Sequence, residues 1–223
     1  MYKEVLYLDL GLKRYRETEI LQEELVERVI DGTSQEYILT VEHPSVITLG
    51  RSTKEDEVFI EDIDRILEKG IEIYRSKRGG SATLHEPGQL VVYPILKLEK
   101  RDVHGYVRDL EELIIELLKI YNIKAIRREK YTGVWIDDKR KICSIGIAVK
   151  KWVTYHGLAL NVSNRLEDFK LFHPCGLEDV EMVSIESVLG ENVDMDELKR
   201  RLLHIFSVIF ERRVVNDAKT CLA

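Results

Sequence analysis

Residues 133–162 read GVWIDDKRKICSIGIAVKKWVTYHGLALNV, a stretch in which apolar side chains alternate with polar or small ones. Such alternation is typical of β-strands that bury one face. The pattern breaks at Asp137-Asp138-Lys139 and again at Lys150-Lys151, and both breaks have the composition of turns. Strands joined by short turns predict an antiparallel meander, and this meander decides the class of the fold.

The residues before the meander predict strands and helices in no regular order. Strands are expected at 4–11, 36–44, 45–50, 71–75 and 90–98, and helices at 15–31 and 61–69. The helix at 15–31 repeats Leu21, Leu25 and Val29 at four-residue spacing, and Gly32 ends it. Pro94 interrupts an otherwise apolar strand, which predicts an edge strand or a bulge.

Two long amphipathic helices complete the prediction. Asp102 is placed to cap the first and Asp194 the second. Because strands and helices are mixed without βαβ regularity, we predict an α+β fold with a mixed or antiparallel sheet and packed helices.

Composition limits the class of protein. The chain has 223 residues and a net charge of −6, which fits one domain over 1–223 and argues against nucleic acid as a partner. No apolar run reaches the roughly 20 residues that a membrane span needs. The first residues lack the pattern of a secretory signal, so a cytoplasmic protein is expected.

One of the three cysteines has an unusual setting. Cys175 lies in Leu171-Phe172-His173-Pro174-Cys175-Gly176-Leu177, between a residue that fixes φ and one that frees it. A reactive thiol needs a defined direction, an open approach and a neighbour that stabilises its thiolate. We interpret Cys143 as a small core residue and Cys221 as incidental. No metal-ligand spacing is present, and neither a metal nor another cofactor is expected.

Four further stretches are notable. They are Arg78-Gly79-Gly80 with Ala82-Thr83-Leu84-His85, Pro87-Gly88-Gln89 with Tyr93-Pro94, Lys141-Ile142-Cys143-Ser144-Ile145-Gly146, and His156-Gly157-Leu158-Ala159-Leu160-Asn161-Val162. Together with Pro174-Cys175-Gly176 they resemble, in order and spacing, the lipoyl(octanoyl) transferase family. The resemblance covers roughly residues 36–190 and implies the fold of the catalytic domains of biotin and lipoate protein ligases.

The resemblance also implies a reaction. An octanoyl group leaves the thioester of acyl carrier protein, forms a thioester on the enzyme's cysteine, and passes to a lysine of a lipoyl domain of a 2-oxoacid dehydrogenase or of the glycine-cleavage H protein. The acyl-bearing cysteine corresponds to Cys175 and the lysine that lowers its pKa to Lys141. The residues implied to line the substrate are Arg78, Gly79, Gly80, Ser81, Ala82, Thr83, Leu84, His85, Ser144, Ile145, Gly146, Gly157, Leu158 and Ala159.

The chemistry is consistent with these residue types. A free thiol has a pKa near 8.5, so only a few per cent is thiolate at pH 7, and a nearby ammonium raises that fraction. Exchange between thioesters is nearly isoenergetic and amide formation from a thioester is downhill. The reaction therefore needs neither ATP nor a metal.

Simpler interpretations of the same residues stay open at this point. Lys141 is compatible with a solvated charge at a strand edge, and Arg78-Gly79-Gly80 with a hairpin turn. His85 and His156 are compatible with core hydrogen bonds, and His173 with a positional role rather than that of a base.

One position departs from the family pattern. The family has glycine between the histidine and proline of its His-Gly-Pro-Gly-Gln segment, where this chain has Glu86. If that glycine supplies a positive φ, glutamate is strained there. Either the turn differs or the position does not need glycine, and a carboxylate near the mouth of the site would affect docking of the carrier.

Alternative functions are an ATP-dependent lipoate or biotin ligase on the same fold, a thioesterase that uses Cys175 and His173, and a scaffold without catalytic activity. The segment 124–151 carries a net charge of +6 in an acidic chain. It predicts a surface that steers an acidic carrier protein toward the site. The candidates for that surface are Arg127, Arg128, Lys150 and Lys151.

Overall fold

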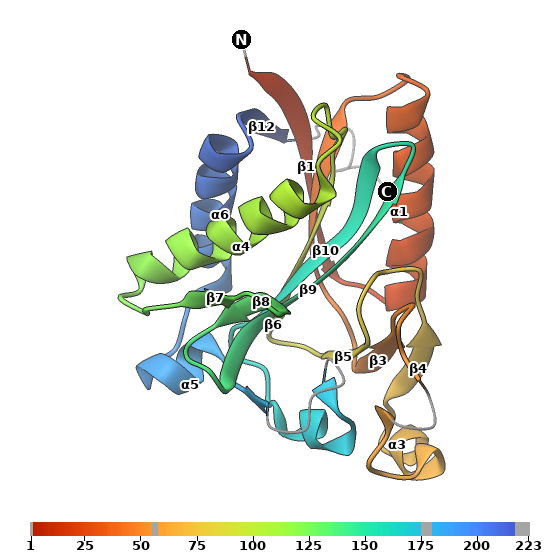
Figure 1. Cartoon of the computed structure of the whole chain (residues 1–223), viewed down its shortest axis with the longest axis vertical. Coiled ribbons are helices and arrows are strands. Elements are labelled where there is room, and N and C mark those ends of the chain that lie inside the picture. The colour runs from red at the N-terminus through yellow and green to blue at the C-terminus, as the bar shows by residue number, and fades with distance from the viewer. Residues whose placement is uncertain (1, 55–57, 175–179, 217–223) are drawn as a thin grey trace.

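The structure is a computed structural model that describes residues 2–54, 58–174 and 180–216. A large sheet runs through the molecule in the order β12-β1-β2-β6-β10-β9-β8-β7, with the short β11 beside β9 (Figure 1). Its strands are β1 (Lys3–Leu12), β2 (Glu36–Glu42), β6 (Gln89–Ile95), β7 (Ile126–Arg128), β8 (Tyr131–Trp135), β9 (Arg140–Lys150), β10 (Val153–Asn161), β11 (Glu181–Met182) and β12 (Arg212–Asn216).

The half of this sheet that ends at β7 contains the predicted meander. β8, β9 and β10 are consecutive and antiparallel, and both expected turns join them. In the first turn the Ile136 amide donates to the Arg140 carbonyl at 2.8 Å, and in the second Lys151 has a φ of 46°. The sheet is mixed because β1 is parallel to both β2 and β12. The prediction of an α+β fold with a mixed sheet is therefore confirmed.

Helices cover both faces of the large sheet (Figure 1). On one face lies α1 (Tyr15–Ile30), and on the other lie α4 (Val103–Ile120) and α6 (Met195–Ile209). The Asp102 carboxylate accepts from the Gly105 amide at 2.8 Å and caps α4, and Asp194 caps α6 in the same way. Both predicted capping residues are thus confirmed.

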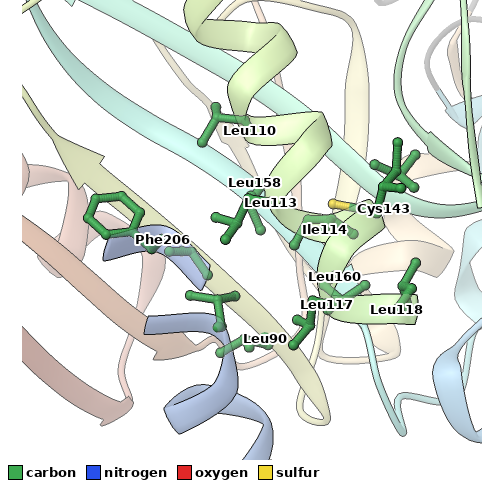
Figure 2. Packing of buried hydrophobic residues seen from close by; sticks show 14 of the residues in the cluster. Leu90, Leu110, Leu113, Ile114, Leu117, Leu118, Cys143, Leu158, Leu160 and Phe206 are labelled. Carbon is green, nitrogen blue, oxygen red and sulfur yellow. The ribbon is translucent and has the colours of Figure 1, made fainter. Parts of the chain in front are cut away.

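The core under α4 has the stripe expected of an amphipathic helix. Figure 2 shows Leu110, Leu113, Ile114 and Leu117 of α4 packed with the apolar side chains of neighbouring strands. Because successive strand residues point to opposite faces, Leu158 packs on this side whereas Ala159 packs on the α1 side.

A second, three-stranded sheet in the order β4-β3-β5 stands beside the large one. It consists of β3 (Val46–Leu49), β4 (Glu72–Arg75) and β5 (Ala82–His85), with the short helix α3 (Ile63–Glu68) next to it. β5 is not among the strands expected from the sequence, because four residues between glycines carry little periodicity. The remaining short elements are η1 (Glu167–Leu171) and α5 (Ile185–Leu189).

The prediction that Pro94 marks an edge strand is wrong. β6 lies between β2 and β10 in the interior of the sheet, and Pro94 pairs with Ile38. The missing amide hydrogen is tolerated because the ladder to β10 ends at Val92. Beyond that point the Thr154 hydroxyl donates to the Pro94 carbonyl at 2.8 Å and accepts from the Leu96 amide at 3.0 Å. Across the three described ranges, none of the helices has both the length and the apolar character needed to cross a bilayer.

Candidate active site

A cavity of about 220 Å³ lies among β5, β6, β8, β9 and β10, beside the start of α1. It brings together most of the residues that the resemblance implied: Arg78, Gly80, Ser81, Ala82, Thr83, His85, Lys141, Ser144, Ile145, Gly146, Gly157, Leu158 and Ala159. These residues come from three separate segments of the sequence, 78–85, 141–146 and 157–159, which the fold brings together. That they hold a substrate stays a prediction.

Two of the predicted site residues that the structure describes, Gly79 and Leu84, do not line this cavity. Leu84 is fully buried in the core beside the small sheet. The amide of Gly79 donates to the Ile147 carbonyl at 2.8 Å and ties the loop before β5 to β9. Cys175 lies outside the described residues, and so does Cys221.

Lys141 is buried at one end of the cavity. Its side chain is among the largest that are fully buried, and the residue is only 1% exposed. Nζ donates to the Thr132 carbonyl at 3.0 Å and lies 5.1 Å from the centre of the Trp135 ring. Because Lys141 is buried, its interpretation as a solvated charge at a strand edge is wrong. Acceptors and ring faces take the place of water around its ammonium.

The peptide that holds Lys141 depends on a glycine. Gly133 has a φ of 125°, and a Cβ on it would lie 2.5 Å from the Cys143 carbonyl oxygen and 2.7 Å from Lys141 Cε. Only glycine fits this backbone and this spacing. Gly133 therefore allows β8 to approach the lysine side chain closely.

Cys143 lies two residues from Lys141 on β9 and is a core residue, as predicted. It is fully buried under α4, beside Ile114 in Figure 2. Burial raises the pKa of its thiol to about 12, and the nearby Lys141 ammonium offsets this only in part. A thiol with such a pKa stays protonated at neutral pH and is a poor nucleophile.

The described residues on both sides of the Cys175 segment are fixed. Before it, the His173 amide donates to the Val58 carbonyl at 2.8 Å. After it, β11 runs parallel to the start of β9, with Met182 opposite Lys141. The Val183 amide donates to the Lys141 carbonyl at 2.9 Å. The strand that follows Cys175 in sequence therefore lies directly beside Lys141.

The opposite end of the cavity is a cluster of aromatic and histidine side chains. Tyr15, the first residue of α1, stacks on His85 with ring centres 5.5 Å apart and on His156 at 6.5 Å. His43 bonds to the Tyr93 hydroxyl at 2.9 Å, and His85 Nδ1 bonds to Gln89 Oε1 at 2.8 Å. The bond to Gln89 agrees with the interpretation of His85 as a core hydrogen-bonding group, whereas the ring of His156 lies 3.5 Å from the Tyr15 hydroxyl through Nδ1 and its buried Nε2 has no hydrogen-bond partner among the described residues.

Burial keeps these histidines neutral. It lowers the pKa of His156 to about 3, with the Arg78 charge adding to the effect, and it lowers the pKa of His43 to about 4. Burial also lowers the pKa of His85 well below its ordinary value and raises the pKa values of Tyr15 and Tyr93. This end of the cavity therefore carries no titrating group near pH 7.

Arg78 supplies the fixed positive charge of this end. Its guanidinium donates to the Thr48 carbonyl at 2.6 Å and to the Thr48 hydroxyl at 2.8 Å. The interpretation of Arg78-Gly79-Gly80 as a hairpin turn is wrong, because β4 and β5 are not neighbours but lie on either side of β3. The segment instead packs against Gly146, where an added Cβ would lie 2.8 Å from the Gly79 carbonyl oxygen.

Glu86 occupies a position that does not need glycine. It is not among the described residues with positive φ, whereas Gly88 in the same turn has a φ of 86°. The Glu86 carboxylate is buried and accepts from Asn164 Nδ2 at 2.9 Å and from the Leu166 amide at 3.1 Å. The expectation of a carboxylate near the mouth is therefore wrong, because Glu86 anchors the loop before η1.

Some lining residues could not be identified from the sequence. They are Tyr15, Ser52, Val91, Tyr93, Lys130, Tyr131, Thr132 and His156. Val91 and Tyr93 are two residues apart on β6, so strand alternation places them on the same face of the sheet. That alternation is the only sign in the sequence that they line one cavity. Tyr15 is at the start of α1, Ser52 and Lys130 are in turns, and Tyr131, Thr132 and His156 are on strands β8 and β10. Nothing in the sequence indicates that these residues face the same cavity.

The basic stretch 124–151 divides into separate surfaces. Lys130 lines the cavity, and the Arg128 guanidinium lies 4.7 Å from the ring centres of both Tyr131 and Trp135. Arg127 is paired instead with Glu111 and Glu112 of α4, and Lys150 with Glu27 of α1. The charges of Arg127 and Lys150 are therefore compensated within the protein, which weakens them as steering residues.

Comparison with known proteins identifies the family. The lipoyl protein ligase A/B catalytic domain matches residues 14–207. The octanoyltransferase of Thermoanaerobacter sp. strain X514 is 43% identical over 205 residues, which cover 91% of this chain and 89% of that protein. The octanoyltransferase of Nitratidesulfovibrio vulgaris strain DP4 is 41% identical over 225 residues, covering 98% and 100%. This chain belongs to the octanoyltransferase family.

A solved structure is similar in fold. The bipartite lipoate protein ligase of Thermoplasma acidophilum superposes with a TM-score of 0.78 at 19% identity, covering 97% of this chain and 87% of that one. The octanoyltransferase family therefore shares the lipoate-ligase fold, and this octanoyltransferase is an acyltransferase built on that fold.

Proposed function

We propose that this octanoyltransferase takes an octanoyl group from the thioester of acyl carrier protein and delivers it to a lysine of a lipoyl domain through a thioester on Cys175. The Cys175 thiolate attacks the acyl carbonyl carbon, a C–S bond to Cys175 forms, and the carrier thiol leaves and takes a proton. The acceptor amine then attacks the same carbon, the C–S bond to Cys175 breaks, and the amine loses a proton as the amide forms.

One observation carries the proposal. The ammonium of Lys141 is buried in the cavity wall, and β11, the strand after Cys175, pairs with β9 at Lys141. Cys175 precedes Met182 by seven residues, a distance that a chain can span in many conformations. An ammonium near a thiol favours the thiolate, which is the reacting form.

The rest of the cavity supports a substrate with an apolar chain. Val91, Ile145, Leu158 and Ala159 contribute apolar surface to its lining. Gly146 and Gly157 allow the segments of the wall to pack closely, because a Cβ on either would lie within 3.0 Å of a backbone oxygen of a neighbouring segment. An alkyl chain bound here would be removed from water, at about 0.8 kcal/mol for each buried methylene.

The test is mass spectrometry of the intact protein after mixing with octanoyl-acyl carrier protein and no acceptor. We expect one octanoyl adduct that hydroxylamine removes and that maps to the peptide containing Cys175. An adduct on Cys143, or no adduct, contradicts the proposal. Adding a lipoyl domain should transfer the adduct to its lysine.

Two controls separate the alternative reactions. Release of free octanoate at the same rate with and without the lipoyl domain would indicate a thioesterase. Octanoylation of the lipoyl domain from free octanoate and ATP, without the carrier, would indicate a ligase.

A further inference from the structure

We propose that Glu111 is a positioning residue that acts through one peptide group to hold Lys141 in place. Glu111 lies on α4, and its side chain has no exposed surface. Its function would otherwise be unexplained, because a carboxylate is costly to bury unless every lone pair has a partner. This inference rests on the proposed function, since it concerns how Lys141 is kept beside the site of acyl transfer.

The two oxygens of Glu111 have different partners. Oε2 accepts from Arg108 at 2.6 Å and lies 3.4 Å from Arg127 Nε, and these two arginines link it to the surface. Oε1 accepts from the Gly133 amide at 3.0 Å. One oxygen is therefore used to compensate the charge and the other to hold β8.

The Gly133 amide belongs to the same peptide group as the Thr132 carbonyl. In a trans peptide the N–H and C=O bonds point in opposite directions. Glu111 holds the N–H, so the carbonyl points the other way, where it accepts from Lys141 Nζ at 3.0 Å. The chain of contacts runs from the Glu111 carboxylate through one peptide to the Lys141 ammonium, and each bond polarises the next.

A carboxylate is needed because this peptide is next to a glycine. Gly133 has a φ of 125°, and glycine permits peptide orientations that other residues exclude. Rotation of the peptide would turn the Thr132 carbonyl toward Glu111 and away from Lys141. A carboxylate accepts hydrogen bonds and donates none, so it repels that carbonyl and selects the orientation observed.

Other charged and titratable groups around Lys141 come from several elements. Arg128 on β7 shares the Trp135 ring with Lys141. Cys143 lies on the same strand as Lys141, and Lys130 and Tyr131 line the same cavity. Among these groups, Glu111 is the one carboxylate.

The experiment measures the rate of alkylation of Cys175 by iodoacetamide as a function of pH, with the label located by peptide mass spectrometry in the full chain. Four proteins are compared: the unmodified chain, Glu111→Leu, Lys141→Ala and the double variant. For Glu111→Leu we expect the midpoint of the pH profile of Cys175 alkylation to rise by about one pH unit, so alkylation at pH 7 slows about tenfold. The double variant should match Lys141→Ala alone, because Glu111 acts through Lys141.

Glu112→Gln is the matched control. Glu112 is the next residue of α4 and pairs with Arg127, the same arginine that Glu111 contacts, yet Gly133 bonds to Glu111. In Glu112→Gln the midpoint of the alkylation pH profile should stay unchanged. Glu111→Gln has nearly the native volume and serves if Glu111→Leu does not fold. Its amide can bond either peptide orientation, so we expect alkylation at pH 7 to slow about threefold, equivalent to half a pH unit.

The outcomes separate the inference from the proposed function. If Lys141→Ala shifts the midpoint and both Glu111 variants leave it in place, Glu111 is only structural and the inference is wrong. Shifts that add in the double variant also overturn it, because Glu111 would then act independently of Lys141. If Lys141→Ala itself has no effect, the proposed pairing with Cys175 fails and the inference fails with it.

Discussion

At one end of the cavity a buried ammonium faces a backbone carbonyl and an indole ring, and at the other an arginine lies among neutral histidines and tyrosines. The Lys141 end is built where the start of β9 lies beside β8 and β11. The histidine end is built on the first residue of α1 and the interior strands, and its groups bond to one another. The first end is suited to influence a titrating thiol, and the second to stay unchanged near neutral pH.

Removal of the Lys141 ammonium should produce the largest change in activity. In Lys141→Ala we expect formation of the acyl-enzyme at pH 7 to slow by well over tenfold, because each unit of thiol pKa is worth about 1.4 kcal/mol. Lys141→Arg should not restore the full rate, because a guanidinium does not release its proton. Single-turnover acylation with octanoyl-acyl carrier protein measures both, and an unchanged alkylation pH profile for Lys141→Ala would refute the role of the lysine.

Glycine substitutions at the two ends should separate stability from reactivity. An added Cβ on Gly157 would lie 2.2 Å from the Val92 carbonyl oxygen, so Gly157→Ala should lower the free energy of unfolding by about 1–3 kcal/mol. Urea unfolding measures this loss. The alkylation midpoint of Cys175 should stay in place in Gly157→Ala but rise in Gly133→Ala, where the added carbon displaces Lys141. Equal midpoints in both variants would contradict the division between the two ends.

The histidine end should control how stability depends on pH. Because burial lowers the pKa of His156 to about 3 and of His43 to about 4, the folded protein binds fewer protons than the unfolded chain at acid pH. Their contribution is complete above about pH 6.5 and is lost as the pH falls toward those values, by up to about 1.4 kcal/mol per pH unit for each histidine. Urea unfolding at pH 7.5, 6 and 5 measures the slope.

His156→Gln should reduce that slope by about one proton, since glutamine does not titrate. The control is His104→Gln, because His104 is exposed on α4 and should leave the slope as it is. If the slope is the same in His156→Gln and in the unmodified protein, His156 takes up its proton as readily in the folded protein as in the unfolded chain, and the prediction fails.

The smallest expected effect concerns the carrier. Lys130→Glu should raise the apparent KM for acyl carrier protein a few fold at low salt and less at high salt, because Lys130 lines the cavity and steering is screened beyond about 10 Å at 0.1 M salt. Lys150→Glu is the control: Lys150 is nine residues along β9 from Lys141, about 30 Å away. Equal effects of both variants, or a similar loss with a small octanoyl thioester, would rule out steering by Lys130.

The sequence was most informative where periodicity is long. The alternation in 133–162 predicts β8, β9 and β10, and the aspartates at 102 and 194 predict the starts of α4 and α6. Short elements such as β5 and β11 hold too few residues for a period to be recognised, and their pairing is decided by distant partners. Pro94 was misplaced because the sequence does not reveal where the neighbouring ladder stops.

Of the candidate site, the segments that line the cavity could be predicted, but the contacts among them could not. Nothing near Lys141 in sequence indicates that the Thr132 carbonyl accepts a hydrogen bond from its ammonium, or that Glu111 holds the peptide group that contains this carbonyl. Glu111 looks like any acidic residue on a helix whose surface is charged. Its burial depends on the approach of β8 to α4, which only tertiary packing determines.

The pairing of β1 with β12 has a consequence for the time course of synthesis. Lys3 pairs with Arg212, so one side of β1 has no partner until nearly every other strand has been made. At about 5–20 residues per second the ribosome needs roughly 10–40 s to pass from β2 to β12. During that interval the Glu4-Val5-Leu6-Tyr7-Leu8 backbone is open to pairing with another nascent chain. A ribosome that stalls before residue 212 would therefore leave an aggregation-prone intermediate, even though the cavity residues are already present.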